Sequence, residues 1–215
     1  MKKIALLLLT VFSIKCGMAQ ARVMSDGSIT YNIQAISESK NPTIVDAFDG
    51  SSFTVLLKGN NVRTDFKSLL RTQSIFYNGA DSTATILKES GKEKYMFQLT
   101  SDNWTNYNKR YLNMSFSTDN SKTKTIAGHT AVFASGTTVN GEKINVWYTT
   151  QLTPQARGYD YVFKNLNGLP LEYEVINGDV TVKYTAVSVL LAPVSASRFD
   201  KPTSGYKIVP YQNQN

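Results

Sequence analysis

The stretch LPLEYEVINGDVTVKYTAVSVLL, residues 169–191, decides the fold of this chain. Before its midpoint, apolar side chains alternate with Glu172 and Glu174, so one face of a strand would be buried and the other solvated. The NGD sequence at 177–179 is a strong signal for a tight turn between two strands. A second alternating run follows that turn, and the segment therefore predicts an antiparallel β-hairpin.

The same pattern recurs along most of the chain. Short alternating runs are separated by turn residues every 8 to 12 residues or so, which is typical of a β-meander or barrel. The further predicted strands cover residues 29–35, 53–58, 62–67, 74–77, 83–88, 95–100, 125–134 and 143–152. The polar stretch 118–124 is predicted to be a loop. The sequence therefore predicts a mainly β, mostly antiparallel domain.

Two short helices are predicted between the strands. Pro42 suits the first position of a helix over 42–49, and Gly50 suits its stop. Aromatic residues at helical spacing predict a second helix over 102–113. These helices could pack on the sheet or form a lid over a cavity, and the two roles are compatible. The lid side chains would be Ile44, Phe48, Trp104, Tyr107 and Tyr111.

The N-terminus resembles a cleavable signal peptide. Two lysines follow Met1, residues 4–14 are mostly apolar, and the AQA sequence at 19–21 fits a small-x-small cleavage site. The apolar run is shorter than the roughly 20 residues of a membrane span. Lipidation of Cys16 is an alternative, but the lysine before it fits a lipoprotein signal badly. Residues 1–21 are therefore predicted to be removed, and the location to be the periplasm, the outer membrane surface or the exterior.

Residues 22–215 would form one domain. Without the three lysines of the predicted signal peptide, 20 basic and 16 acidic side chains remain, a net charge of +4. The basic residues are scattered, so nucleic acid is not an expected partner. The mature chain would contain no cysteine and hence no disulfide or thiolate metal site. Its size, about 195 residues, suits a single β domain with a sizeable core.

Catalytic patterns are missing from the sequence. His129 is the only histidine and lies in a predicted strand, and the chain has no G-x-S-x-G, P-loop or G-x-G-x-x-G motif. Glu172 and Glu174 would lie about 7 Å apart on one strand face, but the alternation places them in water rather than in a glycosidase site. We therefore expect no enzyme activity, no metal and no cofactor.

Aromatic residues are abundant, with 12 Tyr, 10 Phe and 2 Trp. A filled core needs such residues, and an apolar ligand cavity would use the same ones. Periodicity alone does not separate the two possibilities. The apolar face in question would include Tyr31, Ile33, Phe66, Phe97, Val146, Tyr148, Tyr173, Val182 and Tyr184.

Several stretches resemble one protein family. They are FTVLLKGNNVRTDF at 53–66, TIAGHTAVFA at 125–134, INVWYTTQL at 144–152, LNGLPLEYEV at 166–175, and RFDKP with GYKIV within 198–209. Together they resemble the secreted, uncharacterised LolA-like proteins of Bacteroidetes-type bacteria, which include a domain of unknown function. The resemblance covers nearly all of 22–215, and its most specific part is GLPLEYE at 168–174.

The resemblance implies a curved, unclosed antiparallel β-barrel with two or three short helices as a lid. In the best-known members the cavity carries acyl chains of lipoproteins or lipids between membranes, and an arginine on an early strand holds the lid closed. Arg63 is the nearest position here, although the residues around it do not match that motif closely. Lipid or an acylated protein is accordingly the implied partner.

Two functions from different classes remain open. The first is a monomeric envelope protein that binds or carries lipid, lipoprotein acyl chains or another apolar ligand. The alternative is a non-catalytic structural protein whose barrel is filled and whose sheet edges bind another envelope protein. A connected apolar cavity under the helices would favour the first, and a fully packed interior would favour the second.

Overall fold

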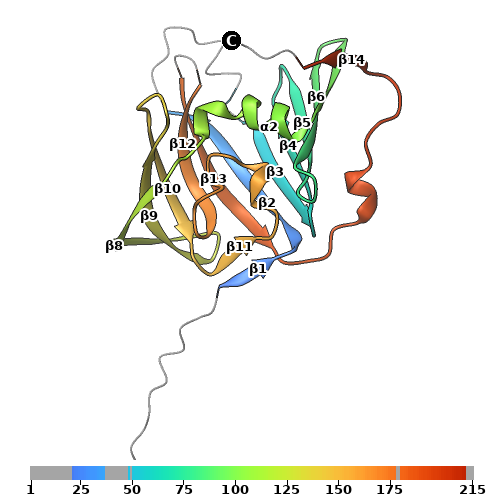
Figure 1. The fold of residues 1–215 in the computed structure, drawn as a ribbon. Coiled ribbons are helices and arrows are strands. Elements are labelled where there is room, and N and C mark those ends of the chain that lie inside the picture. Colours follow the sequence, from blue (N-terminus) through green and yellow to red (C-terminus); the bar gives the residue numbers. More distant parts are fainter. Residues whose placement is uncertain (1–20, 37–47, 49, 178–179, 212–215) are drawn as a thin grey trace, which may run out of the picture.

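The structure, a computed structural model, describes residues 21–36, 48, 50–177 and 180–211 (Figure 1). The predicted signal peptide lies outside the described residues except for its last position. The predicted helix over 42–49 also lies outside them, except for Phe48.

Most of the described chain is β-strand. The strands of the large sheet are β2 (Asp26–Ala35), β3 (Ser52–Lys58), β4 (Asn61–Lys67), β5 (Thr72–Asn78), β6 (Thr83–Ser90), β7 (Glu93–Leu99), β8 (Phe116–Ile126), β9 (His129–Thr137), β10 (Lys143–Thr149), β12 (Leu169–Asn177), β13 (Val180–Leu190) and β14 (Lys207–Pro210). Their spatial order is β14-β7-β6-β5-β4-β3-β2-β13-β12-β10-β9-β8. Two short strands, β1 (Arg22–Met24) and β11 (Leu152–Pro154), pair separately at one end.

The large sheet curves around an interior without closing, because β14 and β8 are its two edges (Figure 1). Neighbouring strands are antiparallel except for β14 on β7, and β1 also pairs with β11 in parallel. The predicted mainly β, unclosed antiparallel architecture is therefore confirmed. The two parallel pairs were not predicted, since they join segments far apart in the sequence.

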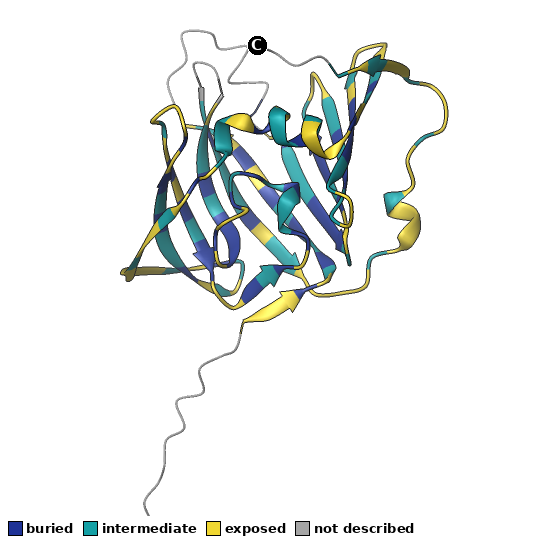
Figure 2. Cartoon of the chain, viewed as in Figure 1, coloured by how far each residue is buried: buried dark blue, intermediate teal, exposed yellow. Residues whose placement is uncertain are grey.

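Buried and more exposed residues alternate along many of the strands (Figure 2), as expected where successive side chains point to opposite faces of a sheet. In β12, Leu171 and Tyr173 are buried inside, whereas Glu172 faces outward and pairs with Lys124 and Lys183. Complete burial of one large apolar side chain contributes about 1.5–3 kcal/mol. This alternation therefore fixes which face of each strand forms the core.

The second predicted helix is shorter than residues 102–113. α2 (Ser101–Tyr107) begins after Thr100, whose side-chain oxygen accepts a hydrogen bond from the Asn103 N–H. It ends at Asn108, whose side-chain amide donates to the Trp104 carbonyl. A separate 3₁₀ turn, η1 (Lys109–Tyr111), follows. Asparagine side chains compete for backbone groups in this way and so end helices.

Two sequence-based expectations near β8 are wrong. Residues 118–124 belong to β8 rather than to a loop, and the predicted strand over 125–134 is divided between β8 and β9 by a turn. β8 is an edge strand whose side chains are mostly exposed, so both of its faces can be polar. Its pairing with β9 also has a register irregularity between Asp119 and Thr123. Ala127 and Gly128 both have positive φ and form the turn.

The segment after β13 runs along the outer face of the sheet to β14 (Figure 1). It contains a 3₁₀ turn, η3 (Ala196–Phe199). Tyr206 packs there against Phe76, Leu87 and Met96, which form a small cluster on the outer face. Within the ranges that the structure describes, no helix has the length and hydropathy of a membrane span.

Candidate functional site

The interior of the curved sheet is filled at one end by the segment 155–168, which connects β11 to β12. This segment includes the 3₁₀ turn η2 (Arg157–Tyr159) and carries buried Tyr161 and Phe163 inward. The Phe163 ring lies 4.7 Å from the Tyr173 ring, measured between centroids. The half of the interior nearest β1 and β11 is a packed core, because Met24, Leu152 and Leu166 there are at most 3 % exposed.

α2 lies against this segment through Trp104, which is 2 % exposed. The indole N–H donates to the Gly158 carbonyl at 2.9 Å, and the ring lies 5.6 Å from Tyr107 in a stacked arrangement. A Cβ on Gly158 would clash with the hydroxyl of Tyr77 on β5, so a glycine lets the Tyr77 side chain pack closely against this residue. α2 is therefore anchored across the interior by one buried aromatic residue.

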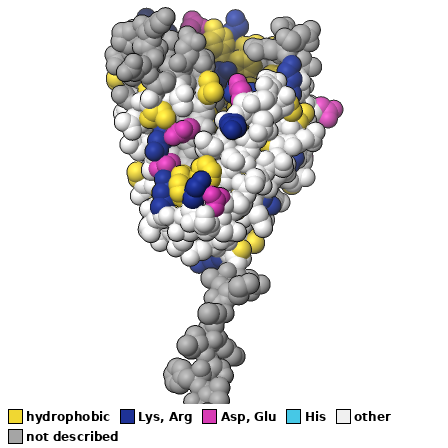
Figure 3. Space-filling model, turned by 90° about the vertical axis from the view of Figure 1, so that its left-hand side faces the viewer, with side chains coloured by type: hydrophobic (Ala, Val, Ile, Leu, Met, Phe, Trp, Pro, Cys, Tyr) yellow, Lys and Arg dark blue, Asp and Glu magenta, His cyan; other side chains and the backbone are white. Residues whose placement is uncertain are grey.

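The other end of the sheet carries the β4–β5 and β9–β10 turns and is here called the open end. The interior there holds a cavity of about 420 Å³, called the inner cavity. Its wall is mainly aromatic and includes Phe48, Phe53, Phe66, Phe163, Tyr173 and Tyr184. Figure 3 shows hydrophobic side chains beside Lys and Arg side chains at this end of the molecule.

Two further cavities adjoin the inner cavity through shared wall residues. A cavity of about 700 Å³, the side cavity, lies between α2, η1 and the strands β6, β7 and β14. A smaller one of about 160 Å³ lies beneath α2. Tyr107 borders all three cavities, and Lys88 borders the inner and side cavities. Because Tyr107 is 39 % exposed, its side chain stands at the entrance to this space.

A carboxyl group, Asp160, also borders the inner cavity. Burial raises the pKa of Asp160 to about 6, although hydrogen bonds from the Val162 and Phe163 N–H groups act in the opposite direction. Burial likewise raises the pKa of Tyr184 to about 12, with Arg71 opposing it. Aromatic rings, one half-buried acid and nearby cations are thus brought together in one space.

Replacing this acid should change how stability depends on pH. The folded-state pKa of Asp160 lies above the ordinary value of 3.8, so the folded protein loses stability as pH rises from about 4 to about 6. Asp160→Asn should remove this loss and raise the free energy of unfolding by about 2–3 kcal/mol at pH 8, with little change at pH 4. Urea unfolding of both proteins at the two pH values tests this, and an equal difference at both would refute it.

The nine predicted cavity residues separate into two groups. Phe66, Tyr173 and Tyr184 line the inner cavity, and Phe97 lines the side cavity. The other five are at most 5 % exposed and pack in the core without lining any of these three cavities: Tyr31, Ile33, Val146, Tyr148 and Val182. Alternation along a strand identifies the inward face but not the depth at which packing gives way to a cavity.

Most predicted lid residues lie beside the cavities. Phe48 and Tyr107 line the inner cavity, and Trp104 lines the cavity beneath α2. Tyr111 is half-buried in η1 and packs against the main core. Ile44 lies outside the described residues.

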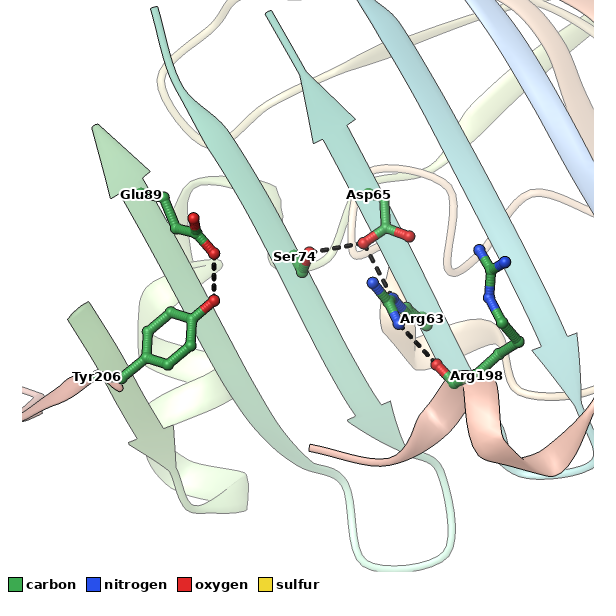
Figure 4. Close-up of polar contacts among 6 residues, drawn as sticks. All are labelled: Arg63, Asp65, Ser74, Glu89, Arg198 and Tyr206. Atoms are coloured by element: carbon green, nitrogen blue, oxygen red, sulfur yellow. Dashed lines mark hydrogen bonds and ion pairs between the residues drawn. The ribbon is translucent and has the colours of Figure 1, made fainter. Parts of the chain in front are cut away.

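Arg63 lies on the outer face of β4, opposite to the side on which α2 packs (Figure 4). Its guanidinium donates to Asp65 at 2.9 Å and to the Arg198 carbonyl at 2.8 Å. Ser74 donates to the same Asp65 carboxylate. Arg63 therefore holds the C-terminal segment against the sheet rather than α2, because strand alternation directs it away from the interior.

The sequence reasoning missed Arg71, Lys88 and Asp160, all of which border the inner cavity. A signal for Lys88 exists, since it follows Ala84 and Ile86 at the inward positions of β6, where a cation interrupts an apolar series. Asp160 lies among alternating aromatic residues, a pattern that resembles a strand although the segment is a loop. Within the described part of the chain, no three His, Cys, Asp or Glu side chains are close enough to hold a metal ion.

Similarity to known proteins is found at the level of the fold. No family model matches the chain, and no curated protein matches it. The crystal structure of MucB is similar with a TM-score of 0.43 and 10 % identity, over 84 % of this chain and 58 % of MucB. The chain thus spans less than two thirds of the length of MucB.

Proposed function

We propose that the chain is an exported, single-domain protein of the cell envelope that binds and carries an apolar ligand, such as a lipid or the acyl chains of a lipoprotein. The observation that carries this proposal is the aromatic-lined inner cavity of about 420 Å³ at the open end. Small-molecule sites have volumes of about 300–1,000 Å³ and mostly apolar walls. The implied processing is removal of residues 1–21 after export.

The physical need for such a carrier is clear. Moving one CH₂ group from water into an apolar site is favourable by a free energy of about 0.8 kcal/mol. Acyl chains therefore do not cross an aqueous compartment unaided. The inner and side cavities share Tyr107 and Lys88 in their walls, and together they offer space for more than one chain segment. The resemblance to LolA-like proteins supports the same function.

A second candidate is a non-catalytic protein that binds another envelope protein. The observation that favours it is β8, an edge strand with mostly exposed side chains. An open edge can accept a strand from a partner. The packed half of the interior is compatible with a protein-binding function and with a carrier function. A direct test of ligand binding is therefore needed to separate them.

Filling the inner cavity should abolish binding. Val175 is half-buried and lines this cavity, so Val175→Trp should project an indole into it. We expect the neutral fluorescent dye N-phenyl-naphthylamine to bind the wild type and to bind this variant at least about tenfold more weakly. Fluorescence titration measures the difference, with circular dichroism as the check of folding.

The matched control is Ile176→Trp. Ile176 is the next residue, is 46 % exposed and faces away from the cavity. The control should bind the dye like the wild type. Unchanged dye binding by a folded Val175→Trp variant would contradict the proposed site.

A further inference from the structure

The inner face of the sheet changes from aromatic to cationic across four neighbouring strands. Phe53 on β3 is paired with Phe66 on β4, and Phe66 is paired with Gln73 on β5. Gln73 is in turn paired with Lys88 on β6. All four residues line the inner cavity. One wall of the cavity is therefore apolar, and the adjacent wall ends in an amide and an ammonium group.

A second cation, Arg71, lies on the same side. Its guanidinium carbon is 5.3 Å from the centre of the Phe66 ring and 5.6 Å from that of Phe48. The Lys88 ammonium lies 5.5 Å from the centre of the Phe97 ring. Both charges are thus held over aromatic rings at the border of the cavity.

The two cations are close enough to affect each other. Burial lowers the pKa of Lys88, and the charge of Arg71 lowers it further. Two neighbouring positive charges disfavour each other unless an anion lies between them. The arrangement is therefore complementary to a negative group.

No carboxylate among the described residues neutralises this pair of cations. Arg71 and Lys88 form no salt bridge with a described residue, whereas Arg110 at the side cavity pairs with Glu142. Asp160 is the one described acid that borders the inner cavity, and its carboxylate accepts a hydrogen bond from the Val162 N–H at 3.1 Å. Over the described part of the chain, the wall near β5 and β6 is therefore positive.

We propose that Arg71 and Lys88 bind the anionic head, a carboxylate or phosphate, of an amphiphile whose chain occupies the aromatic part of the inner cavity. This inference rests on the proposed function and specifies its ligand class. Arginine and lysine form strong charge-assisted hydrogen bonds with both kinds of anion. Gln73 lies between the two walls and offers a further donor to the head.

A pair of ligands that differ only in the head group tests the proposal. Dodecanoic acid and dodecanol should both displace N-phenyl-naphthylamine from the wild type at pH 8. The acid should bind about tenfold more tightly, as expected for one charge-assisted contact at the border of a cavity. In the double variant Arg71→Gln/Lys88→Gln, the preference should fall below about twofold, while the affinity for dodecanol stays unchanged.

The matched control is Lys67→Gln/Lys92→Gln. It removes the same charge from two exposed lysines that line none of the cavities described above, and it should keep the preference for the acid. Thermal melts should show that both double variants fold like the wild type, because Arg71 and Lys88 are themselves exposed at the border.

The outcomes separate this inference from the proposed function. Equal affinities for acid and alcohol in the wild type, or a preference that survives in the Arg71/Lys88 variant, would overturn the inference and leave the carrier function standing. Failure of both ligands and the dye to bind would remove the carrier function and the inference together. Inorganic phosphate at millimolar concentration should barely compete with dodecanoic acid; strong competition would indicate a site for a free anion and overturn the amphiphile assignment.

Discussion

Val146→Glu is expected to leave no stably folded protein at 25 °C. Val146 is 0 % exposed and lies on β10 between Ala134 of β9 and Tyr173 of β12. An unpaired charge at such a position costs several kcal/mol, and the loss of apolar packing adds to it. The free energy of unfolding of a whole domain is only about 5–15 kcal/mol, so this one substitution should remove most of the stability of the folded state.

Circular dichroism and urea unfolding measure this effect, with Val187→Glu as the control. Val187 lies on β13 and is 60 % exposed, so the same substitution there should change the free energy of unfolding by no more than about 0.5 kcal/mol. A Val146→Glu protein with the wild-type urea midpoint would mean that the cavity extends down to β10. The interior beside β10 would then be hollow rather than packed.

Trp104→Ala should lower the free energy of unfolding by about 3–5 kcal/mol, the range for large aromatic residues in a core. Trp104 packs against Tyr77, Tyr107 and Tyr161, with ring centres 5.6–6.2 Å away. The change would also leave the Gly158 carbonyl without its indole donor. Since this residue anchors α2, the helix should lose protection in hydrogen exchange before the sheet does.

Trp104→Phe separates packing from the hydrogen bond. The variant keeps an aromatic ring, so its loss should be about 1–2 kcal/mol. A Trp104→Ala loss below about 1 kcal/mol, the ordinary effect of a single substitution, would show that α2 is not held by this residue. Urea unfolding at one pH is sufficient for all three proteins.

Much of the sheet could be predicted from local pattern. The alternation on either side of residues 177–179 corresponds to the β12–β13 pair, and the strands from β2 to β7 follow their predicted ranges closely. Residues 178–179 of the predicted turn lie outside the described residues. Hairpins are local, so their signals lie within a few residues of each other. β14 and β1 pair with distant segments, and no local signal marks them.

The candidate site was less accessible to sequence reasoning. Alternation identified Tyr173 and Tyr184 as inward-facing, but it equally selected Val146, which is packed in the core. Whether an inward residue meets another side chain or open space depends on the segment 155–168, which has no regular strand pattern and enters the interior from between β11 and β12. The position of the Arg71 side chain depends on the turn between β4 and β5. A turn has no periodic sequence pattern, so alternation could not reveal it.

Native mass spectrometry of the mature wild-type protein, purified gently from its own envelope fraction and compared with Val175→Trp, tests the carrier function most directly. We expect a bound amphiphile at near one-to-one ratio on the wild type, identified as an anion after organic extraction, and a ligand-free Val175→Trp variant. A wild type that stays ligand-free after incubation with envelope lipids would contradict it and favour the protein-binding alternative.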